Sequence, residues 1–136
     1  MKKVFNITIL ILWMIFIFYM SSFKAVESDT QSGFIVNIIS NIFNINNIDL
    51  ITLIVRKSAH MIEYLILGIL MLNCLKDYSI KNVLLVSIML CILYSTCDEI
   101  HQLFIDGRSG EILDILIDSI GIVIGNLIYK KFVIKG

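Results

Sequence analysis

Seven ionisable side chains interrupt apolar stretches of this sequence, and their types could do chemistry. They are five acids and two histidines: His60, Glu63, Asp98, Glu99, His101, Asp114 and Asp118. Carboxylates accept hydrogen bonds, and histidine exchanges protons near neutral pH. If the apolar stretches cross a membrane, an ionised group inside one costs at least ~2.5–3.5 kcal/mol unless it finds polar partners. These residues are therefore the first candidates for a functional site.

The spacing of the candidates places them on shared helical faces. Residues at i, i+4, i+7 and i+8 form one face, which holds Arg56, His60, Glu63 and Tyr64. A second polar face holds Asp98, His101 and Gln102, with Glu99 beside it, and a third holds Asp114 and Asp118, one turn apart. We expect the three faces to meet in one buried polar cluster, with Arg56, Lys57 and Arg108 as the nearest counter-charges.

The amino-acid composition indicates whether these helices lie in water or in a membrane. The chain has 136 residues, of which 58% are hydrophobic and 16% charged, with no proline and a formal net charge of zero. Its mean hydropathy is +0.91. Ordinary soluble domains are ~45–50% apolar and ~25% charged. The composition therefore excludes a disordered chain, argues against a water-soluble domain, and offers no basic patch for a nucleic-acid binder.

Four apolar segments are long enough to cross a bilayer, at about 4–20, 50–75, 82–105 and 112–130. A shorter segment, at about 34–46, has apolar residues on one helical face and suits an amphipathic or re-entrant helix. The predicted fold is all-α and integral to the membrane. It is a four-transmembrane-helix bundle with a short amphipathic helix between helices 1 and 2. We expect residues 1–136 to form a single domain.

The basic residues predict the orientation of this bundle. With the N-terminus inside, seven lysines fall on the cytoplasmic side and four basic residues outside, which favours cytoplasmic N- and C-termini in the cell membrane. The two sides then carry net charges of +6 and −6, because ten of the eleven acids lie outside or in the outer halves of the spans. Lys2 and Lys3 also suit a secretory signal, but no clean cleavage site follows the first span. We therefore expect that span to be retained.

The polar motifs resemble those of the VanZ-like membrane proteins over Trp13 to Gly125. After the first span come the paired serines Ser21 and Ser22; the second span opens with Arg56-Lys57-Ser58-Ala59-His60, then Glu63, Tyr64 and Gly68. The third span ends in Asp98-Glu99-Ile100-His101-Gln102-Leu103-Phe104, followed by Gly107-Arg108, Asp114, Asp118, Gly121 and Gly125. The sequence departs from the family pattern at Phe23, where glutamine is common, and at Asp106, where proline is common.

The resemblance implies a role at the outer face of a bacterial membrane. The family is named for a protein that gives low-level resistance to teicoplanin, a glycopeptide antibiotic that acts on cell-wall precursors. The expected partners are the lipid bilayer and a lipid-linked wall precursor or glycopeptide. Arg56, Lys57, Tyr64, Gln102 and Arg108 would bind the ligand, and His60, Glu63, Asp98, Glu99, His101, Asp114 and Asp118 would orient it or react. No cofactor or metal is identified, and the oligomeric state is open.

Three other interpretations of the cluster stay open. In the first it is a structural ion-pair network that sets helix register, which is costly to break once buried. In the second it is a membrane enzyme that uses its histidines and carboxylates in acid–base or metal-assisted chemistry on a lipid-linked substrate. In the third it moves protons or ions, although a polar cluster at one end makes a poor path across the membrane.

Overall fold

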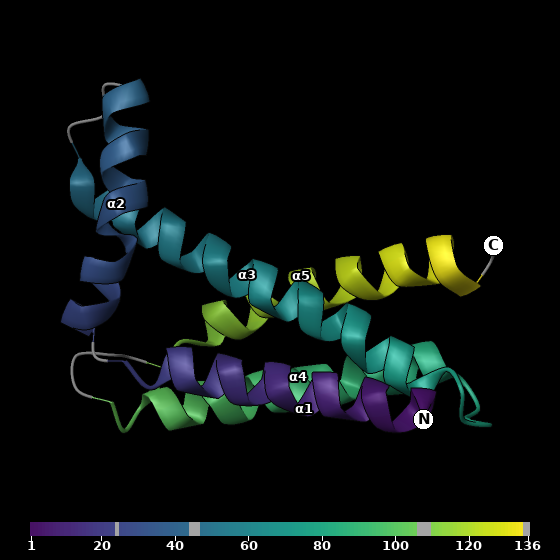
Figure 1. The fold of residues 1–136 in the computed structure, drawn as a ribbon. Helices are drawn as coiled ribbons and strands as arrows, with labels where there is room; N and C mark the ends of the chain where they lie inside the picture. The colour runs from purple at the N-terminus through teal and green to yellow at the C-terminus, as the bar shows by residue number, and fades with distance from the viewer. Residues whose placement is uncertain (24, 44–46, 106–109, 135–136) are drawn as a thin grey trace.

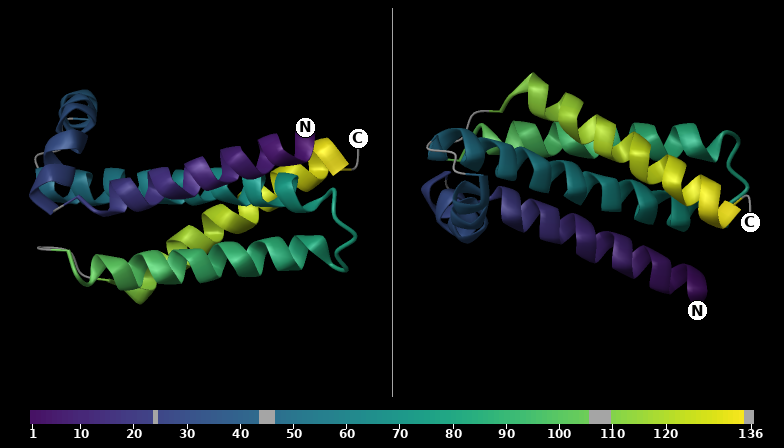
Figure 2. Two further views of the ribbon diagram at one scale, coloured as in Figure 1. Left: turned by 60° about the horizontal axis from the view of Figure 1, so that its bottom comes forward. Right: turned by 90° about the horizontal axis from the view of Figure 1, so that it is seen from above.

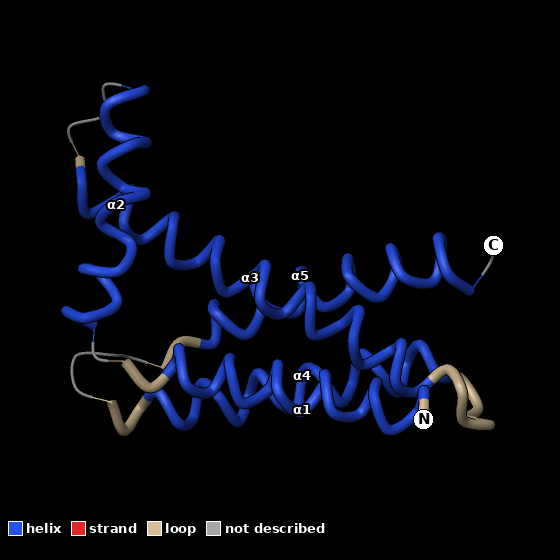
Figure 3. The backbone as a smooth tube through the Cα atoms, viewed as in Figure 1, coloured by secondary structure: helices blue, strands red, loops and turns tan. Residues whose placement is uncertain are grey.

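The computed structural model describes residues 1–23, 25–43, 47–105 and 110–134. Over these residues it is entirely helical, as Figure 3 shows. The helices are α1 (Lys2–Ser21), α2 (Ala25–Phe43), α3 (Ile48–Leu75), α4 (Val83–Gln102) and α5 (Ile112–Tyr129), followed by a short π-helical segment, η1 (Lys130–Ile134). The fold class predicted from the sequence is confirmed. The helix between the first two spans, expected at about 34–46, occupies Ala25–Phe43.

Four of the helices are long and apolar enough to cross a membrane: α1, α3, α4, and α5 continued into η1. Large apolar side chains such as Phe5, Leu93 and Leu116 are exposed along them, as expected for contact with lipid. The chain is therefore a multi-pass membrane protein. At 28 residues α3 is about 42 Å long, which exceeds the ~30 Å of bilayer hydrocarbon.

The spanning helices alternate in direction, so that α1 begins and η1 ends at the same end of the bundle (Figures 1 and 2). The turn between α3 and α4 also lies there. We call this end the terminal end. The opposite end, where α1 and α4 finish and α5 begins, is called the cluster end, because the polar side chains described below lie towards it.

The closest packing in the bundle joins α3 to α5, and glycine makes it possible. A Cβ atom added to Gly125 would lie 2.0 Å from the carbonyl oxygen of Leu65, and one added to Gly121 would lie 2.3 Å from that of Met61. Gly68 on α3 faces the Ile122 carbonyl in the same way. Small residues at this spacing let two helix backbones touch within lipid, where hydrophobic force does not hold helices together.

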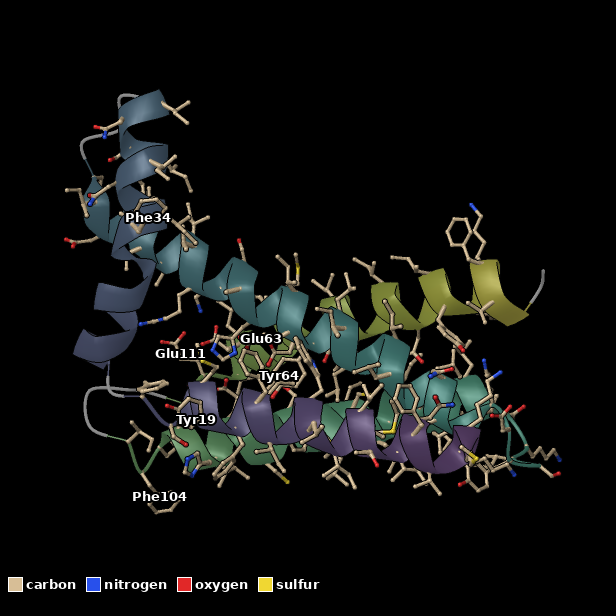
Figure 4. The ribbon with its side chains drawn as sticks, viewed as in Figure 1. Tyr19, Phe34, Glu63, Tyr64, Phe104 and Glu111 are labelled. Atoms are coloured by element: carbon tan, nitrogen blue, oxygen red, sulfur yellow. The ribbon has the colours of Figure 1, made fainter. Side chains whose placement is uncertain are left out.

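The beginning of α3 projects beyond the bundle and packs against α2, which lies across the bundle axis at the cluster end (Figure 1). Val36 on α2 and Ile51 on α3 are buried, whereas Phe34, Ile35 and Ile42 are exposed. Figure 4 shows Phe34 on the part of α2 that stands clear of the four spanning helices. An apolar, exposed helix in this position suits the membrane interface.

Candidate functional site

Asp98 is the centre of the polar cluster, and hydroxyl and amide groups satisfy it. Its Oδ1 atom accepts a hydrogen bond of 2.6 Å from Ser21 Oγ at the end of α1. Its Oδ2 atom accepts one of 3.1 Å from the Tyr64 hydroxyl on α3 and a longer one of 3.4 Å from Gln102 Nε2, one turn further along α4. Asp98 is only 3% exposed. One carboxylate therefore connects three spanning helices.

Glu99 connects α4 with the start of α5. Its Oε2 atom accepts a hydrogen bond of 3.1 Å from the backbone N–H of Glu111, the residue immediately before α5. Its Oε1 atom accepts one of 3.3 Å from Gln102 Nε2. Gln102 therefore bridges both acids of the Asp98-Glu99 pair, which explains why an amide follows them by one turn.

Asp118 is more deeply buried than Asp114, the other acid of α5. Its Oδ2 atom accepts a hydrogen bond of 2.8 Å from Ser95 Oγ on α4. Its Oδ1 atom is buried and has no hydrogen-bond partner among the residues that the structure describes. Asp118 is only 1% exposed, so this oxygen lies inside the bundle.

A charged partner of the acids is Lys57, at the rim of the cluster. Its ammonium group donates to the Asp114 carboxylate at the first turn of α5 and lies 3.4 Å from Glu111 Oε2. Both acids are more exposed than Asp98, Glu99 or Asp118. Of the three predicted counter-charges, Lys57 thus pairs with the outermost acids. The three buried acids accept hydrogen bonds from hydroxyl, amide and backbone N–H groups.

His101 faces α1 from the end of α4. Its ring stacks on Phe18 with the centroids 4.3 Å apart, and its Nε2 atom lies 3.1 Å from Ser22 Oγ. The imidazole is half-buried. This position ties the last turn of α4 to the last turn of α1, next to the Ser21–Asp98 hydrogen bond.

The remaining predicted residues divide between the cluster and its surroundings. Arg56, His60 and Glu63 are half-buried on α3, and Tyr64 is fully buried. Figure 4 shows Glu63, Tyr64 and Glu111 gathered towards the cluster end of the bundle. Arg108 lies outside the described residues. Arg56 also lines a cavity of about 380 Å³ between α2 and α3, together with Asn37, Asp49 and Thr52.

A smaller hollow of about 160 Å³ opens beside Glu99. Its walls are apolar on α4 and α5, and its polar lining consists of Glu99, Thr96 and Glu111; the other lining residues are Ile100, Leu103, Gly110, Ile112 and Ile115. Ile100 and Ile112 are exposed on the outer surface of the bundle. A carboxylate therefore lies in the wall of a hollow that apolar side chains border.

Three serines that contact the polar cluster were not among the site residues predicted from the sequence. Ser21, Ser22 and Ser95 donate to or contact Asp98, His101 and Asp118. The signal for Ser95 was its position three residues before Asp98, on the same helical face. Ser21 and Ser22 could be noticed only as paired hydroxyls at the end of the first span, because their partners are 77 and 79 residues away.

The described residues contain no group of three His, Cys, Asp or Glu side chains placed to hold a metal ion. The histidine and carboxylate positions therefore do not form a recognisable metal-ligand set within this part of the chain. The contacts described above consist of carboxylate acceptors that receive hydrogen bonds from neutral donors, together with the ion pair of Lys57 at the rim.

These observations define a class, a helical multi-pass membrane protein with a buried carboxylate cluster at one end. A sequence profile described as VanZ/LLP1 matches residues 5–135, nearly the whole chain. The chain belongs to the VanZ/LLP1 family. Comparison with curated proteins gave no match. Comparison with solved structures gave none either.

Proposed function

We propose that the cluster end binds a lipid-linked molecule of the cell envelope at the outer membrane surface. The observation that carries this proposal is the hollow beside Glu99, which combines a buried carboxylate with a wall of exposed isoleucine and leucine side chains. A lipid-linked ligand is complementary to this lining. Its hydrocarbon chain can contact the apolar side chains, and its headgroup can hydrogen-bond with the carboxylate.

The charges favour a headgroup rich in hydrogen-bond donors over a bare phosphate. Glu99, Asp98 and Asp118 are acceptors when ionised, and Lys57 already pairs with Asp114 and Glu111. Hydroxyl, amide and amino groups would be attracted to such an end, and wall precursors carry sugars and peptides that supply them. Binding there would lower susceptibility to teicoplanin by altering access to the precursor. The proposed orientation places the cluster end outside and both termini in the cytoplasm.

The test compares Glu99→Gln with Asp77→Asn, an exposed acid of the α3–α4 turn at the terminal end. Each variant is expressed in a teicoplanin-susceptible bacterium. The susceptibility is measured, and the lipids that copurify are identified by mass spectrometry. We expect Glu99→Gln to abolish both the protection and the enrichment of lipid-linked precursor, and Asp77→Asn to retain both.

A second variant separates binding from folding. Ile100→Trp would narrow the hollow without removing a hydrogen bond, since Ile100 is exposed on the lining. The proposal requires this variant to fold and to lose precursor enrichment. Full protection and enrichment in a folded Ile100→Trp or Glu99→Gln variant would contradict it.

A structural role is the second candidate, because Asp98 alone connects α1, α3 and α4. In that case Asp98→Asn and Glu99→Gln would lower the melting temperature in detergent, and the folded fraction would keep its full protection against teicoplanin. The ratio of protection to folded protein distinguishes the two candidates. An acid–base enzyme would instead turn over the copurified lipid, which the same mass spectra would reveal as a product.

A further inference from the structure

We propose a second ligand site at the terminal end, which binds the phosphate headgroup of an anionic phospholipid. The basis is a cavity of about 430 Å³, within the ~300–1,000 Å³ typical of ligand clefts. It lies among the end of α3, the start of α4 and the junction of α5 with η1, lined by Leu72, Ile80, Asn82, Val83, Leu84, Leu85 and Lys130. It is far from the carboxylate cluster and independent of the function proposed above.

The lining combines apolar walls with a positive charge, as the binding of an anionic phospholipid requires. Leu72, Val83 and Leu84 provide apolar walls, and Leu85 at the edge is 55% exposed towards the surroundings of the bundle. Lys130 supplies the positive charge, and its side chain is half-buried at the wall. A charged group beside apolar walls at a helix end matches a headgroup and the beginning of its acyl chains.

The wall of the cavity also contains backbone donors. Asn82, Val83, Leu84 and Leu85 include the first turn of α4, and the described residues provide no side-chain cap from Asn82. Asn82 has φ 56° and ψ 45°, a left-handed conformation that asparagine tolerates, and it turns the chain into the helix. The first N–H groups of a 20-residue helix attract anions, so they would act together with Lys130.

The net charge around the cavity favours an anion. The terminal end carries six described lysines: Lys2, Lys3, Lys76, Lys81, Lys130 and Lys131. Asp77 is the opposing acid in the α3–α4 turn, and it is exposed. The Lys76 ammonium is already engaged, because it donates to the Tyr129 hydroxyl, which in turn donates to Asn73. Lys130 is therefore the lysine that the cavity lining presents to a ligand.

The experiment uses the full chain purified in detergent and reconstituted into vesicles of phosphatidylcholine with one fifth phosphatidylglycerol. Lipids that remain bound after extraction are quantified by native mass spectrometry. We compare Lys130→Met with Lys131→Met, which removes the same charge from an exposed neighbour. We expect Lys130→Met to lower the enrichment of phosphatidylglycerol about fivefold, and Lys131→Met to leave it within a factor of two.

Further measurements distinguish a lipid headgroup from dissolved phosphate and exclude misfolding as the cause of a loss of binding. Inorganic phosphate in excess should not displace the lipid; displacement would mean a site for dissolved phosphate and would overturn the proposal. Leu84→Trp fills the cavity and keeps every lysine, so it should reduce phosphatidylglycerol as Lys130→Met does. Equal loss in Lys130→Met and Lys131→Met, or no loss in either cavity variant, would also overturn it. The melting temperature of each variant confirms that the protein compared is folded.

Discussion

Tyr64 on α3 and Asp98 on α4 are joined by a hydrogen bond of 3.1 Å from the phenol to the carboxylate, inside the bundle and out of contact with solvent. The same carboxylate also accepts a hydrogen bond from Ser21 of α1. A fully buried tyrosine therefore lies where three helices meet, and its hydroxyl links α3 to the carboxylate of α4.

Removing that hydroxyl should loosen the bundle. We expect Tyr64→Phe to lower the free energy of unfolding by about 0.6–1.7 kcal/mol, from the average to the largest value measured for side-chain hydrogen bonds between helices in membranes. Unfolding in detergent by titration with a denaturing detergent gives this value. Tyr19→Phe is the control, since the Tyr19 ring is 61% exposed. Combining Tyr64→Phe with Asp98→Asn should cost less than the sum of the two single changes, and strict additivity would refute the coupling.

Gly125→Ala should separate α3 from α5. The new methyl group would meet the Leu65 carbonyl at 2.0 Å, which is backbone and cannot rotate away. Overpacking of this kind costs about 1–3 kcal/mol, measured as a fall in melting temperature. Gly33→Ala on α2 is the matched control, because a Cβ there has nothing within 4 Å. An unchanged melting temperature for Gly125→Ala would mean that the two helices do not approach as described.

Lys57→Met should leave Asp114 without its charged partner. The pair is partly buried, so the loss should lie between the ~1 kcal/mol of an exposed ion pair and the ~3–5 kcal/mol of a buried one. Replacing both residues, with Lys57→Met and Asp114→Leu together, should recover part of the loss. The partly buried carboxylate is then gone, and Glu111, the other partner of Lys57, is exposed. Lys81→Met, at an exposed lysine of the terminal end, should have no effect on unfolding. A double variant less stable than Lys57→Met would contradict the pairing.

The orientation can be tested with single cysteines placed at opposite ends. In a chain whose Cys74, Cys91 and Cys97 have been replaced, Asp49→Cys lies at the exposed start of α3 and Ser79→Cys in the exposed α3–α4 turn. With cytoplasmic termini, a membrane-impermeant maleimide applied to whole cells should label Asp49→Cys. It should reach Ser79→Cys only after the membrane is permeabilised. The reverse pattern would place the carboxylate cluster on the cytoplasmic side and overturn the proposed orientation.

The architecture could be predicted because its signals are local. Hydropathy along the chain identified four spans, and helical spacing placed Asp98 with Gln102, and Asp114 with Asp118, before any contact was known. The helical face of Arg56, His60, Glu63 and Tyr64 was predicted less completely. The four residues share one face, but of these only Tyr64 is fully buried. At Arg56 the length of α3 contributes to this, because the first turns of the helix project beyond the four spanning helices.

The pairing within the cluster could not be predicted, because it depends on which helix faces meet. By itself the sequence determined that this is a helical membrane protein, that five of its eleven acids lie within the spans, and that these five need polar partners. Only the tertiary structure decided that Lys57 forms an ion pair with Asp114, while Asp98 accepts hydrogen bonds from Ser21 and Tyr64. For the Lys57–Asp114 pair, which joins α3 to α5, the physical reason is the contact of Gly121 and Gly125 with α3. Close backbone approach sets the rotation of one helix against another, and that rotation determines which donors reach each carboxylate.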